Sequence, residues 1–548
     1  MFTNKDNCST GWTEPWRIAI AGAGVSGFAT LGHLVTQLRD RTETPIQIYL
    51  FQPERTYQEA NLTEAQKTRL AYLKALDKQT LIGGGQVYDP MQPALFTFNG
   101  SSAVRGFDFA QQRFDTVNYF NWMQANRDLL MALYPDFAPE QGQQRHPAHT
   151  LDDLHGTSPR GVYGLYLDDQ FRRLLAHLPS HITVQTIPQA VQSFVTSEQK
   201  VNVQTVTASY WVNQLVCAIG HRFAPIRPEW RGQVFAAYPC DRYGAKLPTH
   251  LTIIGAGPSG IEAALHALHN LGVERVSLVS HRGYARLPQI EPAVSYTCPW
   301  LTRRQMQRNP TARWAQYLLR QSLITAYRVS DITYPGWEAM LHIENYGRFL
   351  ADYLQQATPT HPLARLARPV MSFFAQTDDL LSSEERVKVQ RLFSSVKHLF
   401  ATQSWACAEL MLAAMKAGRL SLQAGTFLSH CKTPTIAGPN SKQWQPNSVI
   451  LATGFDSQIS PIYSLAIAQG AAVIDDGGKL VVNLTTGALI DAYGKSSNCY
   501  RVVGTSLSSV DRQAAQTAKA LVQQMALVQQ MALSQKEERI NLHFLRVD

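Results

Sequence analysis

The sequence predicts an α/β fold built from two similar units and a helical insertion. Two observations carry this prediction: each unit begins with a short apolar strand, and each strand runs into a glycine-rich turn followed by a helical pattern. A third observation is a pair of later apolar strands, at 215–220 and 449–454, each of which follows a segment with the pattern of a β-meander, at 182–206 and 420–431. Strands that alternate with helices are typical of parallel sheets.

The first unit opens on the apolar run Ile18–Ala21, which is followed by Gly22, Gly24 and Gly27 and by a second strand at Ile46–Phe51. The first glycine allows a tight turn, the second lets a pyrophosphate approach the backbone, and the third lets the helix pack closely on the strand. The N–H groups at the start of the helix then point at the phosphates.

The same design recurs after the strand 251–254, with Gly255, Gly257 and Gly260 and a second strand at 275–280. A single G-x-G-x-x-G is weak evidence, because glycine-rich turns are common. Two of them in the same strand–turn–helix context are much stronger. We therefore predict two Rossmann-type dinucleotide-binding domains.

The order of the motifs predicts how these domains divide the chain. We expect residues 15–245 and 435–535 to form a discontinuous first domain, whose last part is a helix from Asp511 to about Leu533. Residues 246–434 would form a second domain inserted into the first. Within it, residues 288–420 are rich in helix formers and arginine, which predicts a helical insertion with a solvated basic face.

Composition excludes several classes of protein. Charged residues are 17% of the 548, and 50 Lys and Arg against 41 Asp and Glu give a net charge of +9. Because no basic run is present, we expect no nucleic-acid partner, whereas anionic small ligands suit this charge. The start of the chain does not resemble a signal peptide, and no apolar segment of about 18 residues is present. The sequence thus favours a cytoplasmic protein that does not bind a membrane.

The cysteines and histidines give little sign of a metal or thiol centre. The seven cysteines are scattered without a C-x-x-C pair, which argues against a zinc ribbon or a dithiol redox centre. His146, His149 and His155 lack carboxylates or cysteines at ligand spacing, so we predict no metal site. For His221 we favour an interdomain contact over a catalytic base, and we assign no catalytic residue.

Three segments resemble the bacterial FAD-NAD(P)-binding protein family: GGGQVYDPMQPALFTFN at 83–99, PRGVYGLYL at 159–167 and AIGH at 218–221. The resemblance covers about residues 15–285 and returns at 449–456. The family is related to flavoproteins with two dinucleotide-binding domains, among them class B and N-hydroxylating flavin monooxygenases. The resemblance implies that the first domain holds FAD and that the second holds NADPH.

The sequence departs from the usual flavoprotein pattern at three places. An acid usually ends the second strand and binds the adenosine ribose, but here the acid is missing and either Gln52 or Glu54 must serve. Near the C-terminus Gly504 is followed by Thr505 in place of the usual Asp. The class B fingerprint would place His at the position of Ala236, which argues against an ordinary class B activity.

The resemblance also implies which other residues contact the cofactors. The first of the three segments passes the flavin ring in the resembled family, so Gln92 and Asn99 are candidates to hydrogen-bond the flavin, with a plain loop as the alternative. The second strand of the second motif ends without an acid, at Ser280, His281 and Arg282. His281 and Arg282 are candidates to bind the 2′-phosphate of NADPH, with Arg282 as a solvated loop residue as the alternative.

The resemblance implies an NADPH-dependent FAD monooxygenase that uses O₂ to oxygenate the nitrogen of a small amine or amino acid. Two alternatives stay open. One is an NAD(P)H-dependent flavin reductase without a dithiol. The other is a non-catalytic nucleotide-binding protein, suggested by Gln52 and Thr505, which stand where acids usually stand.

Overall fold

The computed structural model describes most of the chain between Glu14 and residue 530. The described ranges are 14–41, 44–76, 82–97, 106–108, 113–115, 118–135, 158–197, 200–220, 226–243, 247–288, 296–356, 358–400, 403–439, 442–454, 459–475, 478–483, 486–503, 513–528 and 530. Two of the predicted site residues, Asn99 and Gly504, lie outside these ranges.

The first sheet has six strands and draws on both ends of the described chain. Its order is β18 (Ala488–Ile490), β19 (Ser496–Val502), β9 (Gln214–Cys217), β1 (Trp16–Ala21), β2 (Ile46–Phe51) and β5 (Ile182–Ile187). All neighbouring pairs are parallel except β18–β19. The predicted apolar strands of the first unit are thus confirmed as the centre of a parallel sheet.

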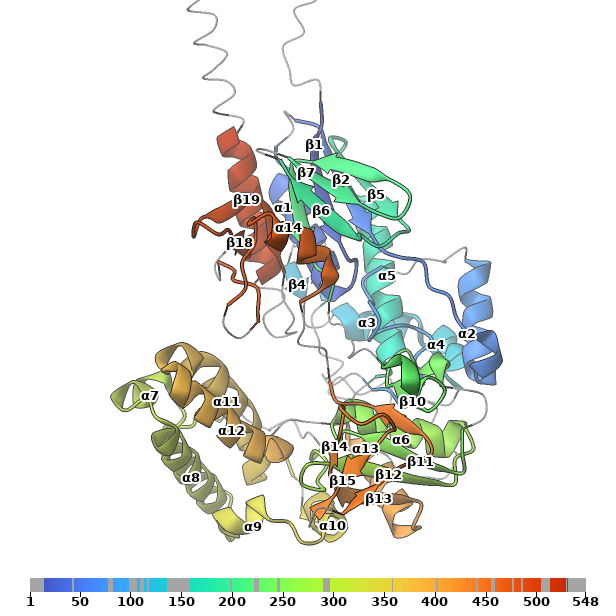
Figure 1. The fold of residues 1–548 in the computed structure, drawn as a ribbon, viewed down its shortest axis with the longest axis vertical. Coiled ribbons are helices and arrows are strands. Elements are labelled where there is room, and N and C mark those ends of the chain that lie inside the picture. Colours follow the sequence, from blue (N-terminus) through green and yellow to red (C-terminus); the bar gives the residue numbers. More distant parts are fainter. Residues whose placement is uncertain are drawn as a thin grey trace, which may run out of the picture.

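The second sheet has five strands and every pair in it is parallel. Its order is β10 (Val234–Ala236), β17 (Val449–Leu451), β11 (His250–Ile254), β12 (Arg275–Ser280) and β13 (Leu420–Ala424). Figure 1 shows the first sheet in the upper half of the molecule and the second in the lower half. The mixed α/β fold with two parallel sheets is therefore as predicted.

The predicted meanders are wrong in part, because the first strand of each joins a parallel sheet. β5 forms the edge of the first sheet beside β2 and β13 forms the edge of the second beside β12. Antiparallel pairing begins only afterwards. It links β6 (Ser193–Thr196), β7 (Val201–Gln204) and β8 (Ser209–Val212), and then β14 (Thr426–Phe427), β15 (Ile436–Ala437) and β16 (Gln443–Trp444).

Helices cover the first sheet and fill the space between the two sheets. They are α1 (Val25–Leu38), α2 (Glu64–Ala75), α3 (Asn118–Ala125), α4 (Arg127–Leu133), α5 (Arg160–Ala176), α14 (Ser464–Ala468) and a helix at 513–528. A short hairpin, β3 (Gly106–Asp108) with β4 (Arg113–Asp115), precedes α3. The core of this half joins β1 and β2 to α1, α5 and the 513–528 helix.

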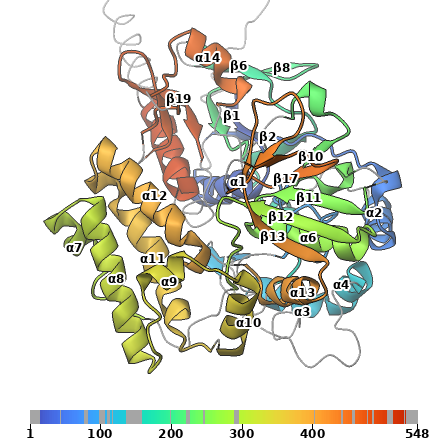
Figure 2. The same cartoon turned by 60° about the horizontal axis from the view of Figure 1, so that its bottom comes forward.

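The chain between β12 and β13 is mostly helical. Its helices are α7 (Arg303–Arg308), α8 (Ala312–Val329), α9 (Trp337–Leu341), α10 (Tyr346–Gln356), α11 (Pro362–Thr377), α12 (Ser383–Phe400) and α13 (Trp405–Lys416). In Figure 2, α7, α8, α11 and α12 form a layer beside the second sheet, while α6 (Pro258–Asn270) and α13 lie against the sheet itself. One core continues from this sheet into α8, α10, α11, α12 and α13.

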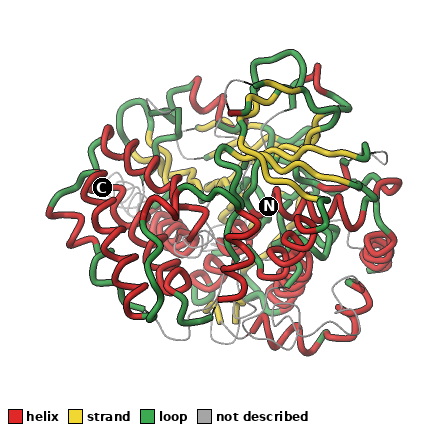
Figure 3. The backbone as a smooth tube through the Cα atoms, turned by 90° about the horizontal axis from the view of Figure 1, so that it is seen from below, coloured by secondary structure: helices red, strands yellow, loops and turns green. Residues whose placement is uncertain are grey.

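The view from below separates the two kinds of element. Strands run through the upper part of Figure 3, and helices cover them from the lower side. No helix within the described residues is long and apolar enough to cross a membrane. The proposed domain boundaries, at 245/246 and 434/435, stay a prediction.

Candidate functional site: two glycine turns and the network between them

The first glycine turn has the geometry that the spacing predicts. Gly22 has a φ of +100°, and a Cβ there would lie 2.4 Å from the Ala218 carbonyl oxygen. A Cβ on Gly27 would lie 1.9 Å from the Gly22 oxygen, so only glycine lets α1 pack this closely on the turn. α1 begins after Gly24 without a side-chain cap. Its first N–H groups are therefore available to an anion.

The segment 82–97 lies directly against this turn. The Gly83 N–H donates to the Ala23 carbonyl at 2.6 Å, and a Cβ on Gly24 would lie 3.5 Å from Gly85 Cα. The segment then continues to Phe96, whose ring contacts Tyr238 and His266 with centroid distances of 5.6 and 5.9 Å. One stretch of chain thus connects the first turn with the half of the molecule that holds the second.

Gln52 and Glu54, which follow β2, differ in burial and in what they contact. Gln52 is buried, and its Oε1 accepts a hydrogen bond from the Ala23 N–H at 3.1 Å, so this side chain is part of the turn itself. Glu54 is exposed. Of the two candidates for the ribose, Glu54 is the one with a carboxylate not committed to the turn. The structure does not test either assignment, and both stay proposals.

An arginine that the sequence analysis missed also reaches this turn. Arg55 donates to the Gly85 carbonyl and forms an ion pair with Asp89. Tyr57 donates to Asp89 Oδ1 at 3.0 Å. Burial lowers and the Asp89 carboxylate raises the pKa of Arg55, with a net upward shift. The cation at the first turn is therefore neutralised by an acid of the protein.

Gln92 offers a buried acceptor that fits a flavin. Only 1% of this residue is exposed, and its Nε2 donates to the Gln86 carbonyl at 3.0 Å. Its Oε1 is buried and has no hydrogen-bond partner among the described residues. A buried acceptor without a donor is costly. The imide N–H of a flavin is a donor of the required kind, so the residues present fit FAD.

The second glycine turn repeats the geometry of the first. Gly255 has a φ of +108°, and a Cβ there would lie 2.3 Å from the Ala452 carbonyl oxygen. A Cβ on Gly260 would lie 1.7 Å from the Gly255 oxygen. α6 begins after Gly257 without a side-chain cap, as α1 does after Gly24. The structure thus contains two turns that can each receive a phosphate group.

The predicted residues at the end of β12 lie beside this second turn but differ in what they contact. The Ser280 hydroxyl is bonded to the backbone of Tyr284 at 3.1 Å. His281 is exposed, with Nδ1 3.1 Å from the Thr426 hydroxyl oxygen. Arg282, also exposed, donates to the Ser395 carbonyl at 3.1 Å, near the end of α12. His281 and Arg282 therefore remain accessible to a ligand at the strand end.

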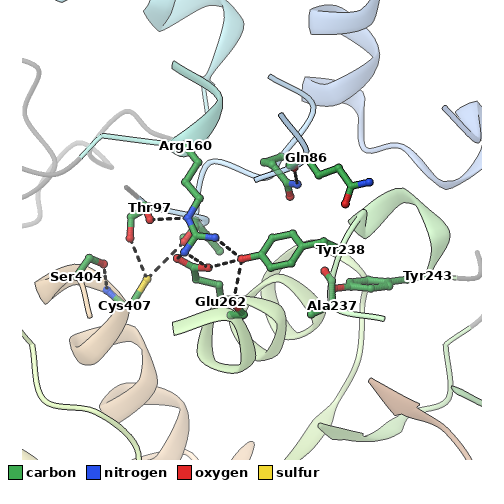
Figure 4. A network of polar contacts seen from close by, with 12 residues as sticks. Gln86, Thr97, Arg160, Ala237, Tyr238, Tyr243, Glu262, Ser404 and Cys407 are labelled. Carbon is green, nitrogen blue, oxygen red and sulfur yellow. Dashed lines mark hydrogen bonds and ion pairs between the residues drawn. The ribbon is translucent and has the colours of Figure 1, made fainter. Parts of the chain in front are cut away.

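A buried network of charged and polar groups joins the two halves (Figure 4). Arg160, at the start of α5, donates to the Thr97 carbonyl and forms an ion pair with Glu262 of α6, both at 2.9 Å. The Tyr238 hydroxyl contacts Arg160 and donates to Glu262 at 3.1 Å. Burial raises the pKa of Glu262, and the Arg160 guanidinium opposes that shift. The network fixes α6, and with it the second turn, against the segment that passes the first.

The cysteines of the described chain do not form a redox pair. Six of them are free, and four are buried: Cys217, Cys240, Cys298 and Cys407. Burial raises the pKa of Cys217 and of Cys407 to about 12. These thiols therefore stay protonated at neutral pH. The described part of the chain contains no group of three or more histidines, cysteines or acids that could hold a metal ion.

Residues 19–222 match a family model described as FAD-NAD(P)-binding. This part of the chain is similar to FAD-NAD(P)-binding domains. The match confirms the predicted resemblance and the predicted cofactors, FAD and a nicotinamide dinucleotide. No curated protein matches the sequence significantly.

Solved structures with a similar arrangement are distant in sequence. L-lysine 6-monooxygenase from Pseudomonas syringae is 15% identical with a TM-score of 0.45, covering 93% of this chain and 100% of its own. Ornithine hydroxylase from Pseudomonas aeruginosa is 12% identical with a TM-score of 0.48, covering 93% and 99%. Thioredoxin reductase from Lactococcus lactis is 8% identical with a TM-score of 0.41, covering 94% and 99%. Their names include both oxygenating and reducing enzymes.

Proposed function

We propose that the protein is an NADPH-dependent FAD monooxygenase that oxygenates the nitrogen of a small amine or amino acid. The family match supports the coarser statement that it is an FAD-dependent oxidoreductase. In the proposed reaction one NADPH, one proton and one O₂ are consumed. One oxygen atom is bonded to the substrate nitrogen, the other leaves as water, and NADP⁺ is released.

The observation that supports the proposal against a disulfide reductase is the arrangement of the cysteines. A flavoprotein that reduces disulfides through a dithiol needs two neighbouring cysteines, and the seven cysteines of the sequence include no C-x-x-C pair. The thiol nearest the buried network, Cys407, donates to the Leu95 carbonyl at 3.4 Å, and its pKa is raised to about 12 by burial. The cysteines therefore count against a disulfide reductase, and O₂ is the electron acceptor in our proposal, with a flavin reductase that lacks a dithiol as the alternative.

The protein's residues would bind, orient and shield the cofactors. Bound FAD supplies the redox chemistry, since it accepts a hydride and passes the electrons on to O₂. The N–H groups at the start of α1 would hold its pyrophosphate, and Gln92 Oε1 would accept a hydrogen bond from the flavin imide. The ion pair between Arg160 and Glu262, both at most 5% exposed, would help to shield the contact between the two halves from water.

NADPH is preferred over NADH in this proposal because of the residues that follow β12. NAD-binding domains usually carry an acid there for the ribose hydroxyls. Here the exposed residues are His281 and Arg282, and the family match does not distinguish the two coenzymes. A guanidinium contact with the 2′-phosphate is charge-assisted and selects the phosphorylated form.

The test couples three measurements on the purified flavoprotein: NADPH oxidation, O₂ uptake and product mass, with a panel of amines and amino acids. We expect one substrate to raise O₂ uptake and to gain one oxygen atom, with NADPH consumed in equal amount. Gly24→Val, expected to lack FAD, is the control for background oxidation. If every amine gives only hydrogen peroxide while an artificial electron acceptor is reduced efficiently, the protein is a reductase. If NADPH is not oxidised at all, the non-catalytic alternative holds.

A further inference from the structure

A second arginine lies across the middle glycine of the second turn. The Arg286 guanidinium is 3.5 Å (Nη2) to 3.8 Å (Nε) from the position that a Cβ on Gly257 would occupy. Gly257 is the glycine at which a pyrophosphate approaches the backbone in this motif. Arg286 follows the end of β12 by six residues, so it is supplied by the coenzyme-binding unit itself and reaches back to the start of α6.

Arg286 has no acid to neutralise it. No ion pair or side-chain hydrogen bond of Arg286 is found among the described residues, and burial alone lowers its pKa. Arg286 is partly buried, and a cation withdrawn from water without a counter-ion is costly to the fold. Natural proteins retain such a group where a ligand supplies the opposite charge.

A lysine from the helical insertion joins this arginine. Lys397 lies in the last turn of α12, over the Phe393 ring at 5.9 Å. The residues that follow each cation are bonded to each other, since the Leu287 N–H donates to the His398 carbonyl at 3.0 Å. Burial lowers the pKa of Lys397, and the charge of Arg286 lowers it further. No acid of the described chain forms an ion pair with Lys397.

We propose that Lys397 and Arg286 together bind the pyrophosphate of the nicotinamide coenzyme at the second glycine turn. The inference rests on the proposed binding of that coenzyme at Gly257. It makes the helical insertion a part of the coenzyme site, because α12 supplies one of the two cations. Two cations and the positive end of α6 match the two negative charges of a pyrophosphate.

The pyrophosphate is favoured over the 2′-phosphate by position. The adenosine ribose lies at the end of β12 in domains of this kind, where Arg282 is held by the Ser395 carbonyl. Arg286 instead covers the glycine at the helix start. The two arginines therefore predict different specificities: Arg282 should act on NADPH alone, whereas Arg286 and Lys397 should act on NADPH and NADH alike.

The experiment measures binding of NADPH and of NADH to the oxidised FAD-loaded protein by the change in the flavin spectrum, and in parallel by thermal shift. Lys397→Met keeps an unbranched side chain and removes the charge. We expect Kd to rise about tenfold for both coenzymes, as for the loss of a charge-assisted contact, with their ratio unchanged. Lys397→Arg should restore binding. Lys388→Met, on the same helix but paired with Glu384 and Glu385, is the matched control and should bind like the wild type.

Three outcomes would overturn the proposal. Unchanged binding of both coenzymes by Lys397→Met removes Lys397 from the site. A loss confined to NADPH moves Lys397 to the 2′-phosphate, as expected for Arg282→Ala. If the wild-type protein binds neither coenzyme, the proposed function fails and the inference fails with it. FAD content and melting temperature, which should equal those of the wild type, separate a binding defect from a folding defect.

Discussion

The two glycine turns have nearly the same backbone, but the arginine at the first is paired with an acid and the arginine at the second is not. In each, a Cβ on the third glycine would collide with the oxygen of the first, at 1.9 Å in the first turn and 1.7 Å in the second. They differ in what lies over the middle glycine. Gly24 faces Gly85, whose carbonyl is bonded by an arginine that Asp89 neutralises, whereas Gly257 faces Arg286, which has no acidic partner in the described chain.

This difference distinguishes a resident ligand from an exchanging one. A turn whose cation is already paired binds its ligand through shape and hydrogen bonds. The first turn is of this kind, and the segment 82–97 lies across it. A turn with unpaired cations attracts an anionic ligand over a longer range and gains its neutralising charge only when that ligand binds. The first arrangement suits a cofactor that stays bound, and the second suits a coenzyme that enters and leaves in each reaction.

The largest expected effect comes from placing a branched side chain on each middle glycine. Both positions leave ordinary contact distance for a Cβ, 3.5 Å in each case, so the fold should survive. Gly24→Val should abolish FAD binding, and Gly257→Val should retain FAD but lose the nicotinamide coenzyme. FAD released by heat and coenzyme titration measure the two effects. If Gly24→Val keeps stoichiometric FAD, the first turn is not the flavin site.

Replacing Asp89 should leave the first turn with an unpaired arginine, as in the second turn, and should lower the stability of the fold. Asp89→Asn keeps the side-chain size but leaves Arg55 buried without a carboxylate, which should lower the free energy of unfolding by about 3 kcal/mol. Arg286→Met removes an unpaired cation and should leave stability unchanged or raise it, while weakening coenzyme binding. Denaturant titration of the FAD-loaded protein measures the free energy of unfolding of both variants. Equal destabilisation by the two changes would remove the contrast between the turns.

These expectations show which parts of the site the sequence could predict. The glycines follow from spacing, because the turn, the phosphate approach and the helix packing are all local. Arg286 and Lys397 gave no such signal, since they meet only when α12 folds back onto the chain after β12.

The edge strands were misread for a different reason. Along β5, burial is greatest at Ile182 and Ile187, while the residues between are partly exposed. Such a pattern resembles an antiparallel meander, although β5 is the edge of a parallel sheet with one side open. β1, buried on both faces, was predicted correctly because a continuous apolar run has fewer alternatives.

Acid should weaken the half of the molecule that holds the second turn. His266 of α6 is buried, and burial lowers its pKa to about 4. The unfolded chain takes up this proton below about pH 6.5, so the stabilisation is complete above that pH and is lost as the pH falls from there toward the folded pKa. We expect a loss of about 2 kcal/mol between pH 7 and pH 5. His266→Gln should flatten this part of the pH profile, and an unchanged profile would assign the effect to other groups.

The smallest expected effect is on the salt dependence of binding. Because its cations are unpaired, the second turn should bind NADPH a few-fold more weakly when ionic strength rises from about 0.01 to about 0.1 M, where the screening length falls to about 10 Å. FAD content should not change over this range. Lys397→Met should reduce the salt dependence of coenzyme binding, and Lys388→Met should not. An equal salt response of FAD and NADPH would contradict the distinction between the two turns.

The position of β19 in the first sheet has a consequence for the order in which the chain can fold. β19 pairs with β9 through Tyr500 and Leu215, although the second sheet needs no residue beyond β17. During synthesis the second sheet can therefore form first. Until β19 is made, the edge of β9 stays unpaired, although β9 is buried along its whole length in the final structure. An open strand edge is prone to pairing with other chains. The unit that contains the first glycine turn thus becomes complete last, although its first strand is made first.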